Sequence, residues 1–165
     1  MPSQPKDLND LFHETLKDIY FAEKQILRAL PKMAHKANGE QLAQAFEQHR
    51  TETEGQIERL EKVFEMIGKN PRGKTCDAIM GIIDESKEVM EDFANSDALD
   101  AGILAAAQAV EHYEISRYGT LIAWAEQLGL SDAVPLLEET LAEERRTDVL
   151  LSKLALASIN VKAAA

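Results

Sequence analysis

The spacing of turn signals along the chain limits the folds that it can adopt. The turns contain Gly, Asn, Ser or Asp and stand at residues 38–39, 68–73, 95–97 and 129–131. They separate four long segments rich in Ala, Leu, Glu, Lys and Gln, each of which predicts a helix of about 30 residues and about 45 Å. Two of the turns are so short that each must join two antiparallel helices. Residues 69–96, in contrast, are enough to cross the length of the helices, and residues 74–95 within them predict a shorter amphipathic helix.

This spacing predicts an all-α protein with a ferritin-like four-helix bundle. The bundle consists of two antiparallel hairpins joined by a long crossover, about residues 69–96, that contains a short helix. We expect one domain over residues 6–160, because 165 residues is the usual size of a single domain. Residues 1–5 and 161–165 are expected to be flexible termini.

Composition excludes several classes of function. The chain has 18 Lys and Arg against 29 Asp and Glu, a formal net charge of −11, which argues against nucleic acid or an anionic membrane as partner. Its single cysteine, Cys76, excludes an intrachain disulfide and a Cys-rich zinc site. The start of the sequence shows no signal-peptide pattern, and the apolar runs are too short to span a membrane. We therefore expect a cytoplasmic protein.

The predicted core-facing stripe of each helix is interrupted near its middle by polar residues. At a spacing of 3.5 residues, each stripe is apolar toward both ends. The interruptions are Glu23 in the first helix, His49, Glu52 and Gln56 in the second, Glu111, Glu114 and Tyr118 in the third, and Glu144 and Asp148 in the fourth. The hairpin geometry places these residues at one level of the bundle, so six carboxylates are expected to share its interior.

Six buried carboxylates need compensation. No Lys or Arg lies on the stripes at this level; Arg59 is expected to point off the stripe and Glu143 to face solvent. Two bound metal ions would supply the missing positive charge, and a site rich in oxygen with one or two imidazoles suits iron or manganese better than zinc. His49 and His112 are the imidazoles nearby. The alternative is a metal-free polar layer that only sets the register of the helices.

Several stretches resemble the YciE/YciF family of bacterial stress-associated proteins. They are Tyr20–Gln25 (YFAEKQ), Ala45–His49 (AFEQH), Glu52–Glu58 (ETEGQIE), Val110–Ile115 (VEHYEI), Tyr118–Leu121 (YGTL) and Glu139–Glu144 (ETLAEE), and the resemblance covers about residues 6–160. The family belongs to the ferritin-like superfamily, together with rubrerythrin and ferritin. The resemblance implies a di-metal centre with iron as the first choice of ion and manganese as the second.

The resemblance also implies a set of ligands. The carboxylate ligands would be Glu23, Glu52, Glu111, Glu114 and Glu144, with Glu111 and Glu114 matching the paired Glu-x-x-Glu of rubrerythrin-type sites. The Glu-x-x-His pattern of the superfamily is missing, because Gly55 and Thr147 stand where the histidines would be. His49 and Asp148 complete the expected ligand set, and Gln56, Tyr118 and His112 are expected beside it.

Two classes of function follow from this site. The first is a di-metal oxidoreductase of the stress response that reduces peroxide or oxidises ferrous iron. A peroxidase of this kind would need an external reductant, because the chain lacks the Cys ligands of a rubredoxin-type module. The second is a stress protein without turnover that binds metal or is held together by it. In either case we expect a homodimer.

Overall fold

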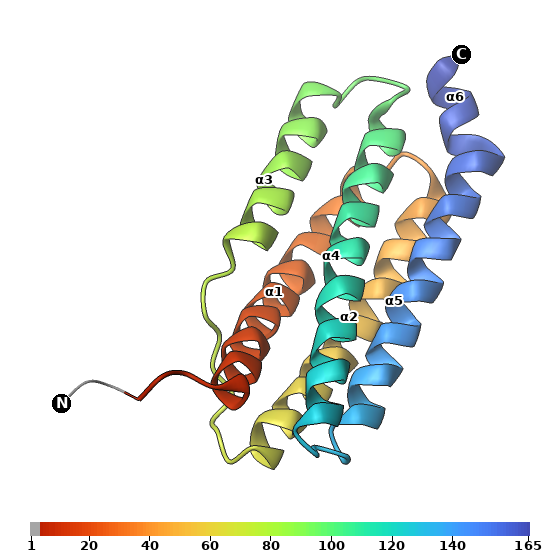
Figure 1. Ribbon diagram of the computed structural model, residues 1–165. Coiled ribbons are helices and arrows are strands. Elements are labelled where there is room, and N and C mark those ends of the chain that lie inside the picture. Colours follow the sequence, from red (N-terminus) through yellow and green to blue (C-terminus); the bar gives the residue numbers. More distant parts are fainter. Residues whose placement is uncertain (1–3) are drawn as a thin grey trace.

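All regular structure in residues 4–165, the range that the computed structural model describes, is helical (Figure 1). The elements in chain order are α1 (Leu8–Lys36), α2 (Glu40–Met66), α3 (Asp77–Asp92), α4 (Leu99–Gln127), α5 (Val134–Leu154), the π-helix η1 (Ala155–Ile159) and α6 (Asn160–Ala164). In that range no helix is both long and apolar enough to cross a membrane.

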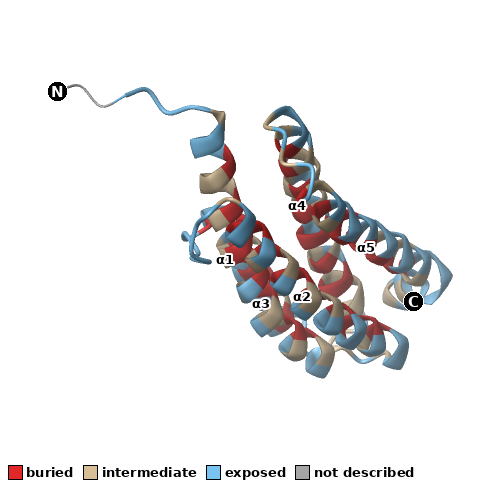
Figure 2. Ribbon diagram, turned by 90° about the horizontal axis from the view of Figure 1, so that it is seen from below, coloured by how far each residue is buried: buried red, intermediate tan, exposed pale blue. Residues whose placement is uncertain are grey.

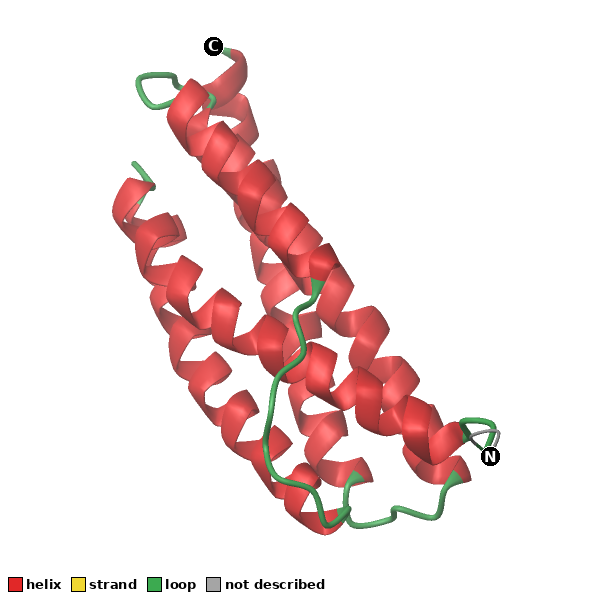
Figure 3. Cartoon of the chain, turned by 90° about the vertical axis from the view of Figure 1, so that its left-hand side faces the viewer, coloured by secondary structure: helices red, strands yellow, loops and turns green. Residues whose placement is uncertain are grey.

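The helices form the predicted bundle of two hairpins. α1 and α2 are antiparallel neighbours, as are α4 and α5, and the hairpins pack with α2 against α5 and α1 against α4. The long connection begins at the lower end of α2 in Figure 1 and climbs along α1 before α3 continues to the upper end. Figure 3 shows the same segment, in green, running along the helices. The all-α class, the hairpins and the crossover with its short helix are therefore confirmed.

Local sequence explains where the helices start and stop. Asp7 and Asp10 form a capping box at the start of α1, each side chain accepting a hydrogen bond from the other residue's backbone N–H (2.9 and 3.0 Å). Gly68 and Gly129, with φ of 68° and 71°, follow α2 and α4 in the left-handed conformation that glycine adopts without steric cost. Asp100 accepts hydrogen bonds from the backbone N–H groups of residues 38 and 39, both at 2.7 Å, which ties the first turn to α4.

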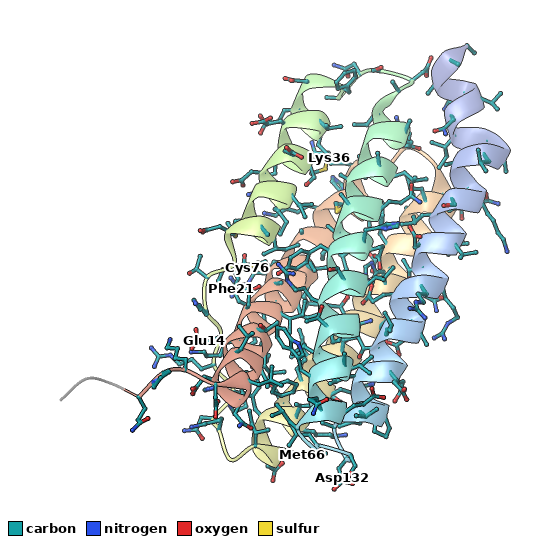
Figure 4. All side chains as sticks on the ribbon, in the orientation of Figure 1. Glu14, Phe21, Lys36, Met66, Cys76 and Asp132 are labelled. Carbon is teal, nitrogen blue, oxygen red and sulfur yellow. The ribbon has the colours of Figure 1, made fainter. Side chains whose placement is uncertain are left out.

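The crossover is attached to α1 by specific contacts. The backbone N–H of Lys74 donates to the carbonyl of Lys17 (3.1 Å), and its ammonium group lies 2.9 Å from the carboxylate of Glu14. Figure 4 labels Glu14, Phe21 and Cys76 along this ascending segment. Cys76 is buried and caps α3 by accepting a hydrogen bond from the N–H of Ile79. These contacts hold α3 over the gap between α1 and α4.

Apolar layers lie on both sides of the central polar level. On α1, Phe12, Leu16 and Ile19 are buried on one side of Glu23, and Ile26 and Leu30 on the other. The other long helices repeat this arrangement, and Figure 2 shows the buried residues in red along the inner sides of the helices. Because burial of apolar surface dominates the stability of such a bundle, the central level can serve another purpose.

The chain ends differ from the sequence-based boundaries. Helical structure continues past residue 160 through α6 to Ala164, joined to α5 by the π-helical turn η1. Alanine is the strongest helix former, and Ala155, Ala157, Ala163 and Ala164 support this continuation. At the other end, Gln4 and Pro5 are exposed and lie outside any helix, and the first three residues of the predicted flexible terminus lie outside the described range.

Candidate metal centre

Four buried side chains from three helices meet at the middle of the bundle. His49 comes from α2, Glu111 and Glu114 from α4, and Glu144 from α5. One potential ligand atom from each lies within 4.8 Å of the others. Glu111 and Glu114 share one face of α4 because residues three apart on a helix lie one above the other. The group therefore has the residue types and the compactness of a metal site.

The imidazole of His49 lies among the carboxylates. Its Nδ1 is 3.0 Å from Oε1 of Glu111, whereas its Nε2 is 3.5 Å from Oε2 of Glu144 and 4.0 Å from Oε2 of Glu114. Within residues 4–165, no Lys or Arg forms an ion pair with these three carboxylates. A single imidazole is thus the only cationic group available to them in the described structure.

Glu23 adjoins this group from α1. Its side chain is fully buried, and Oε1 accepts a hydrogen bond of 2.5 Å from the hydroxyl of Tyr118, which is also fully buried. Its other oxygen has no hydrogen-bond partner among the described residues. Burial, followed by the charge of Glu144, raises the pKa of Glu23 to about 8. Glu23 is therefore a fourth carboxylate with one oxygen free to bind a cation.

The electrostatics show a shortage of positive charge. Burial and the charge of Glu144 raise the pKa of both Glu111 and Glu114 well above the usual carboxyl value. Burial opposes charge on His49, but the charges of Glu111 and Glu144 outweigh it and raise the pKa of the imidazole. Burial would raise the pKa of Glu144 too, but Glu111 and His49 stabilise its charged form and lower that pKa. Protons and cations therefore compete for these side chains.

Buried polar atoms without hydrogen-bond partners indicate which kind of ligand the centre of the bundle can hold. Both carboxylate oxygens of Glu114 and of Glu144, and Nε2 of His49, are buried without a hydrogen-bond partner in the described part of the chain. Buried polar groups are normally paired, since each unpaired one costs about 1–3 kcal/mol. Carboxylate oxygens and an imidazole nitrogen are ligands for iron and manganese. The residues present therefore fit a metal ion.

The structure does not bring Glu52 into this group. Its side chain is half-buried and lies 3.2 Å from the amide of Gln48 and 3.4 Å from the hydroxyl of Thr147. The next buried residue of α2 after His49 is Thr53, four positions along the chain, and not Glu52. Counted from His49, the helical period of 3.6 residues falls between positions 52 and 53, and the rotation of α2 in the bundle turns Thr53 inward.

Asp148 and His112 also lie outside the group. Asp148 accepts a hydrogen bond from Gln108 (3.2 Å) and lies 3.1 Å from Nε2 of His112, whose side chain is 67% exposed. The stripe of α5 continues inward at Thr147, three residues after Glu144. Thr147 therefore stands at the inward position after Glu144, and Asp148 lies beside the group, in contact with Gln108 and His112.

A second buried polar network lies beside the centre, between α2 and α5. Gln56, one of the residues expected beside the ligands, donates to Oε2 of Glu143 (3.0 Å). Arg59 lies 2.6 Å from Oε1 of Glu143 and donates to the hydroxyl of Thr140 (2.9 Å). The expectation that Glu143 faces solvent is wrong, because Arg59 turns toward it and pairs with it in the interface. One sequence signal could have predicted this network. On each helix the two polar residues are three positions apart, at 56 and 59 on α2 and at 140 and 143 on α5, so each pair shares one face.

Comparisons with known proteins support the fold. A family described as "Domain of unknown function (DUF892)" matches residues 7–164. Protein YciF of Escherichia coli (strain K12) is 49% identical over 160 residues, which are 96% of each chain. The crystal structure of the E. coli stress protein YciF superposes with a TM-score of 0.90 at 46% identity, over 94% of this chain and 99% of that one.

Two further solved structures are similar. That of "YcfI, a putative structural protein" from Rhodopseudomonas palustris has a TM-score of 0.88 and 47% identity, covering 92% of this chain and 97% of that one. A protein from Xanthomonas campestris pv. campestris has a TM-score of 0.72 at 20% identity, over 94% of both chains, and supports the fold alone.

Proposed function

This chain belongs to the DUF892 family, and we propose that it is a metal-binding stress protein with two metal ions in its bundle, iron first and manganese as the alternative. We propose further that it uses these ions to oxidise ferrous iron or to reduce peroxide. The observation that carries the proposal is the set of buried, unpaired ligand atoms on His49, Glu114 and Glu144, to which Glu23 and Glu111 are added. The stress role rests on its similarity to the E. coli stress protein YciF.

Charge supports two ions over one. Glu23, Glu111, Glu114 and Glu144 carry four negative charges when ionised, and His49 is neutral as a ligand. Two divalent cations would balance these charges, whereas one would leave two negative charges in a buried site. Uncompensated buried charge costs several kcal/mol. Glu111 and Glu114 on α4, together with Glu23 of α1 and Glu144 of α5, would hold the two ions.

The bound ions would supply redox chemistry and Lewis acidity, and the chain's own residues would position them. Tyr118 fixes Glu23 by donating to one of its oxygens, which leaves the other oxygen for a cation. The apolar layers on either side keep bulk water away from this level. With ferrous iron as substrate, two ions would give up two electrons, which together with two protons would balance the reduction of one dioxygen to hydrogen peroxide. Reduction of peroxide to two waters consumes the same numbers of electrons and protons, which an external donor would supply.

The second candidate is a metal-binding structural protein without turnover. It is favoured by the single imidazole in the group and by Thr147 in place of the second histidine of the superfamily pattern. The name of the R. palustris relative, "a putative structural protein", points the same way. Under this proposal the ions only neutralise the carboxylates and hold four helices together.

Metal analysis tests both candidates. Protein purified without chelator, aerobically and anaerobically, is expected to contain close to two iron or manganese ions per chain by mass spectrometry. A metal content of zero in both preparations would overturn the proposal. The iron-loaded protein is then mixed with peroxide or dioxygen. Absorbance changes with repeated turnover support the oxidoreductase, and a loaded protein that never responds supports the structural alternative.

We also propose that the protein is a homodimer. Val149, Leu150, Leu156 and Val161, toward the C-terminal end, are exposed apolar side chains that a dimer interface would cover. A two-fold dimer is the commonest way to cover them. Sedimentation equilibrium should give twice the chain mass of 18.3 kDa, and Leu156→Lys should shift the protein toward monomer. A monomeric wild-type protein at micromolar concentration would contradict this.

A further inference from the structure

A small apolar cavity lies against the metal centre. His49 and Glu111 form its inner end, and the remaining walls are aliphatic side chains of α1, α3 and α4 together with Ser86. The cavity has room for about one water-sized molecule. The hydroxyl of Ser86 donates to the carbonyl of Ile83 (2.7 Å), so its hydrogen is already used. A molecule in this cavity would find very few hydrogen-bond partners before reaching the ligands.

The cavity is separated from the surface by a thin wall. Ala29, Ile83 and Ser86 line both the cavity and a second hollow between α1 and α3. That hollow continues outward into an open groove, with which it shares Lys32, Lys87 and Met90. Figure 1 shows α1 and α3 side by side along this path, and Figure 4 labels Lys36, which lines the outer end of the groove. The shared residues place the three hollows next to one another, from the surface groove to the cavity beside His49, with a narrow barrier between the second hollow and the cavity.

The path is cationic on the outside, although the chain is acidic overall. Its outer walls carry Arg28, Lys32, Lys36 and Lys87, and Glu91 is the one carboxylate among the residues that line them. His35 lies there too, and Lys87 lies 3.5 Å from Asp84. A divalent cation would be repelled at the outer end and would lose its hydration in the apolar cavity. Metal ions therefore need another way in.

We infer that this path is the access route of dioxygen to the metal centre, with Ala29, Ile83 and Ser86 as its narrow point. The inference rests on the proposed di-metal function and makes it more specific. Dioxygen is small, uncharged and apolar, so it loses nothing on leaving water for an aliphatic cavity. Hydrogen peroxide would lose its hydrogen bonds there. The route therefore selects dioxygen, which favours oxidation of ferrous iron over peroxide reduction.

The first experiment uses the protein without metal. Crystals are pressurised with xenon, an apolar and uncharged probe somewhat larger than dioxygen, and a xenon site is expected in the cavity between His49 and Ser86, with a small outward shift of its aliphatic walls. Ala29→Leu, which thickens the wall, is expected to lower its occupancy, and Ala123→Leu, the same change at an exposed site on α4, is expected to leave it unchanged. No xenon in the wild-type cavity would overturn the route, whatever the metal content.

The second experiment uses anaerobically ferrous-loaded protein. Ala29→Leu should bind the same number of ferrous ions at the same rate as wild type. Its oxidation by dioxygen should slow on the order of tenfold or more, since α3 must then open locally, whereas its oxidation by peroxide should slow less. Unchanged oxidation by dioxygen, equal slowing with both oxidants, or slowed ferrous loading would each overturn the inference. A wild-type protein that binds no iron would contradict the proposed function. The xenon experiment would still show whether the cavity admits an apolar molecule.

Discussion

Replacement of Glu114 by Gln should remove metal from the protein and leave the bundle folded. Both oxygens of Glu114 are buried and unpaired, and the side chain sits between His49 and Glu23 in the centre. The amide has the same shape but lacks the charge, so the remaining carboxylates no longer balance two divalent ions. We expect the metal content to fall from about two ions per chain to one or none, with an affinity loss on the order of 100-fold or more.

The same substitution should stabilise the metal-free protein. Burial and the charge of Glu144 raise the pKa of Glu114, so the folded metal-free protein must hold a proton on this carboxyl group, which costs about 1.4 kcal/mol for each pH unit above the ordinary carboxyl value. The neutral amide does not carry this cost. Calorimetry in the presence of chelator should therefore show a higher unfolding temperature for Glu114→Gln than for wild type. With saturating iron or manganese the order should reverse, because only the wild type gains the full binding free energy.

Glu126→Gln provides the matched control. Glu126 lies on the same helix but is exposed, so this variant should keep both metal content and unfolding temperature. If Glu114→Gln retained the wild-type metal content, Glu114 would not be a ligand. A metal-free Glu114→Gln protein that unfolded at a lower temperature than wild type would show that the carboxylate stabilises the fold without metal.

Turn signals were sufficient to predict the topology because they depend on local chemistry. Gly68 and Gly129 end their helices at positive φ whatever they pack against, and the length of residues 69–96 leaves only a crossover. The inward stripes of α1 and α4 follow the predicted pattern, so Glu23, Glu111 and Glu114 are buried as expected. These parts of the fold and of the centre are properties of single helices.

The predictions and the structure differ where the rotation of one helix against another decides which side chains face the interior. Glu52 and Asp148 lie at the edges of their stripes, and small rotations of α2 and α5 bring Thr53 and Thr147 inward in their place. The pair of Arg59 and Glu143 depends on the same rotation, because each residue is off the stripe when its helix is considered alone. The proposed dioxygen path depends on how closely α3 packs against α1 and α4. The spacing of apolar residues in the sequence does not predict that distance.

Without metal, the protein should lose stability as the pH rises from about 5 to about 8. Glu23 has a pKa of about 8 in the folded state against 4.5 as its ordinary value, so in this window the folded state keeps a proton that the unfolded state has lost. From Glu23 alone, stability therefore falls by about 1.4 kcal/mol per pH unit across the window, and the raised pKa values of Glu111 and Glu114 act in the same direction. The raised pKa of His49 acts in the same direction above its ordinary value of 6.5. The lowered pKa of Glu144 acts oppositely, but only below about its ordinary value of 4.5.

The stabilisation that bound metal gives should have the opposite pH dependence and increase as the pH rises. This contrast distinguishes a metal centre from a polar layer that only sets the register of the helices. Cations displace the protons held on Glu23, Glu111 and Glu114, so they bind more tightly as the pH rises. The rise in unfolding temperature caused by manganese should therefore grow between pH 5 and pH 8, as measured by thermal unfolding with and without chelator. Glu23→Gln should make the metal-free slope less steep by about 1.4 kcal/mol per pH unit, and added salt should leave the wild-type slope in place because the groups are buried. A slope abolished by salt would assign it instead to repulsion among the surface carboxylates, and a manganese effect that shrank with rising pH would mean that the ion binds outside this cluster.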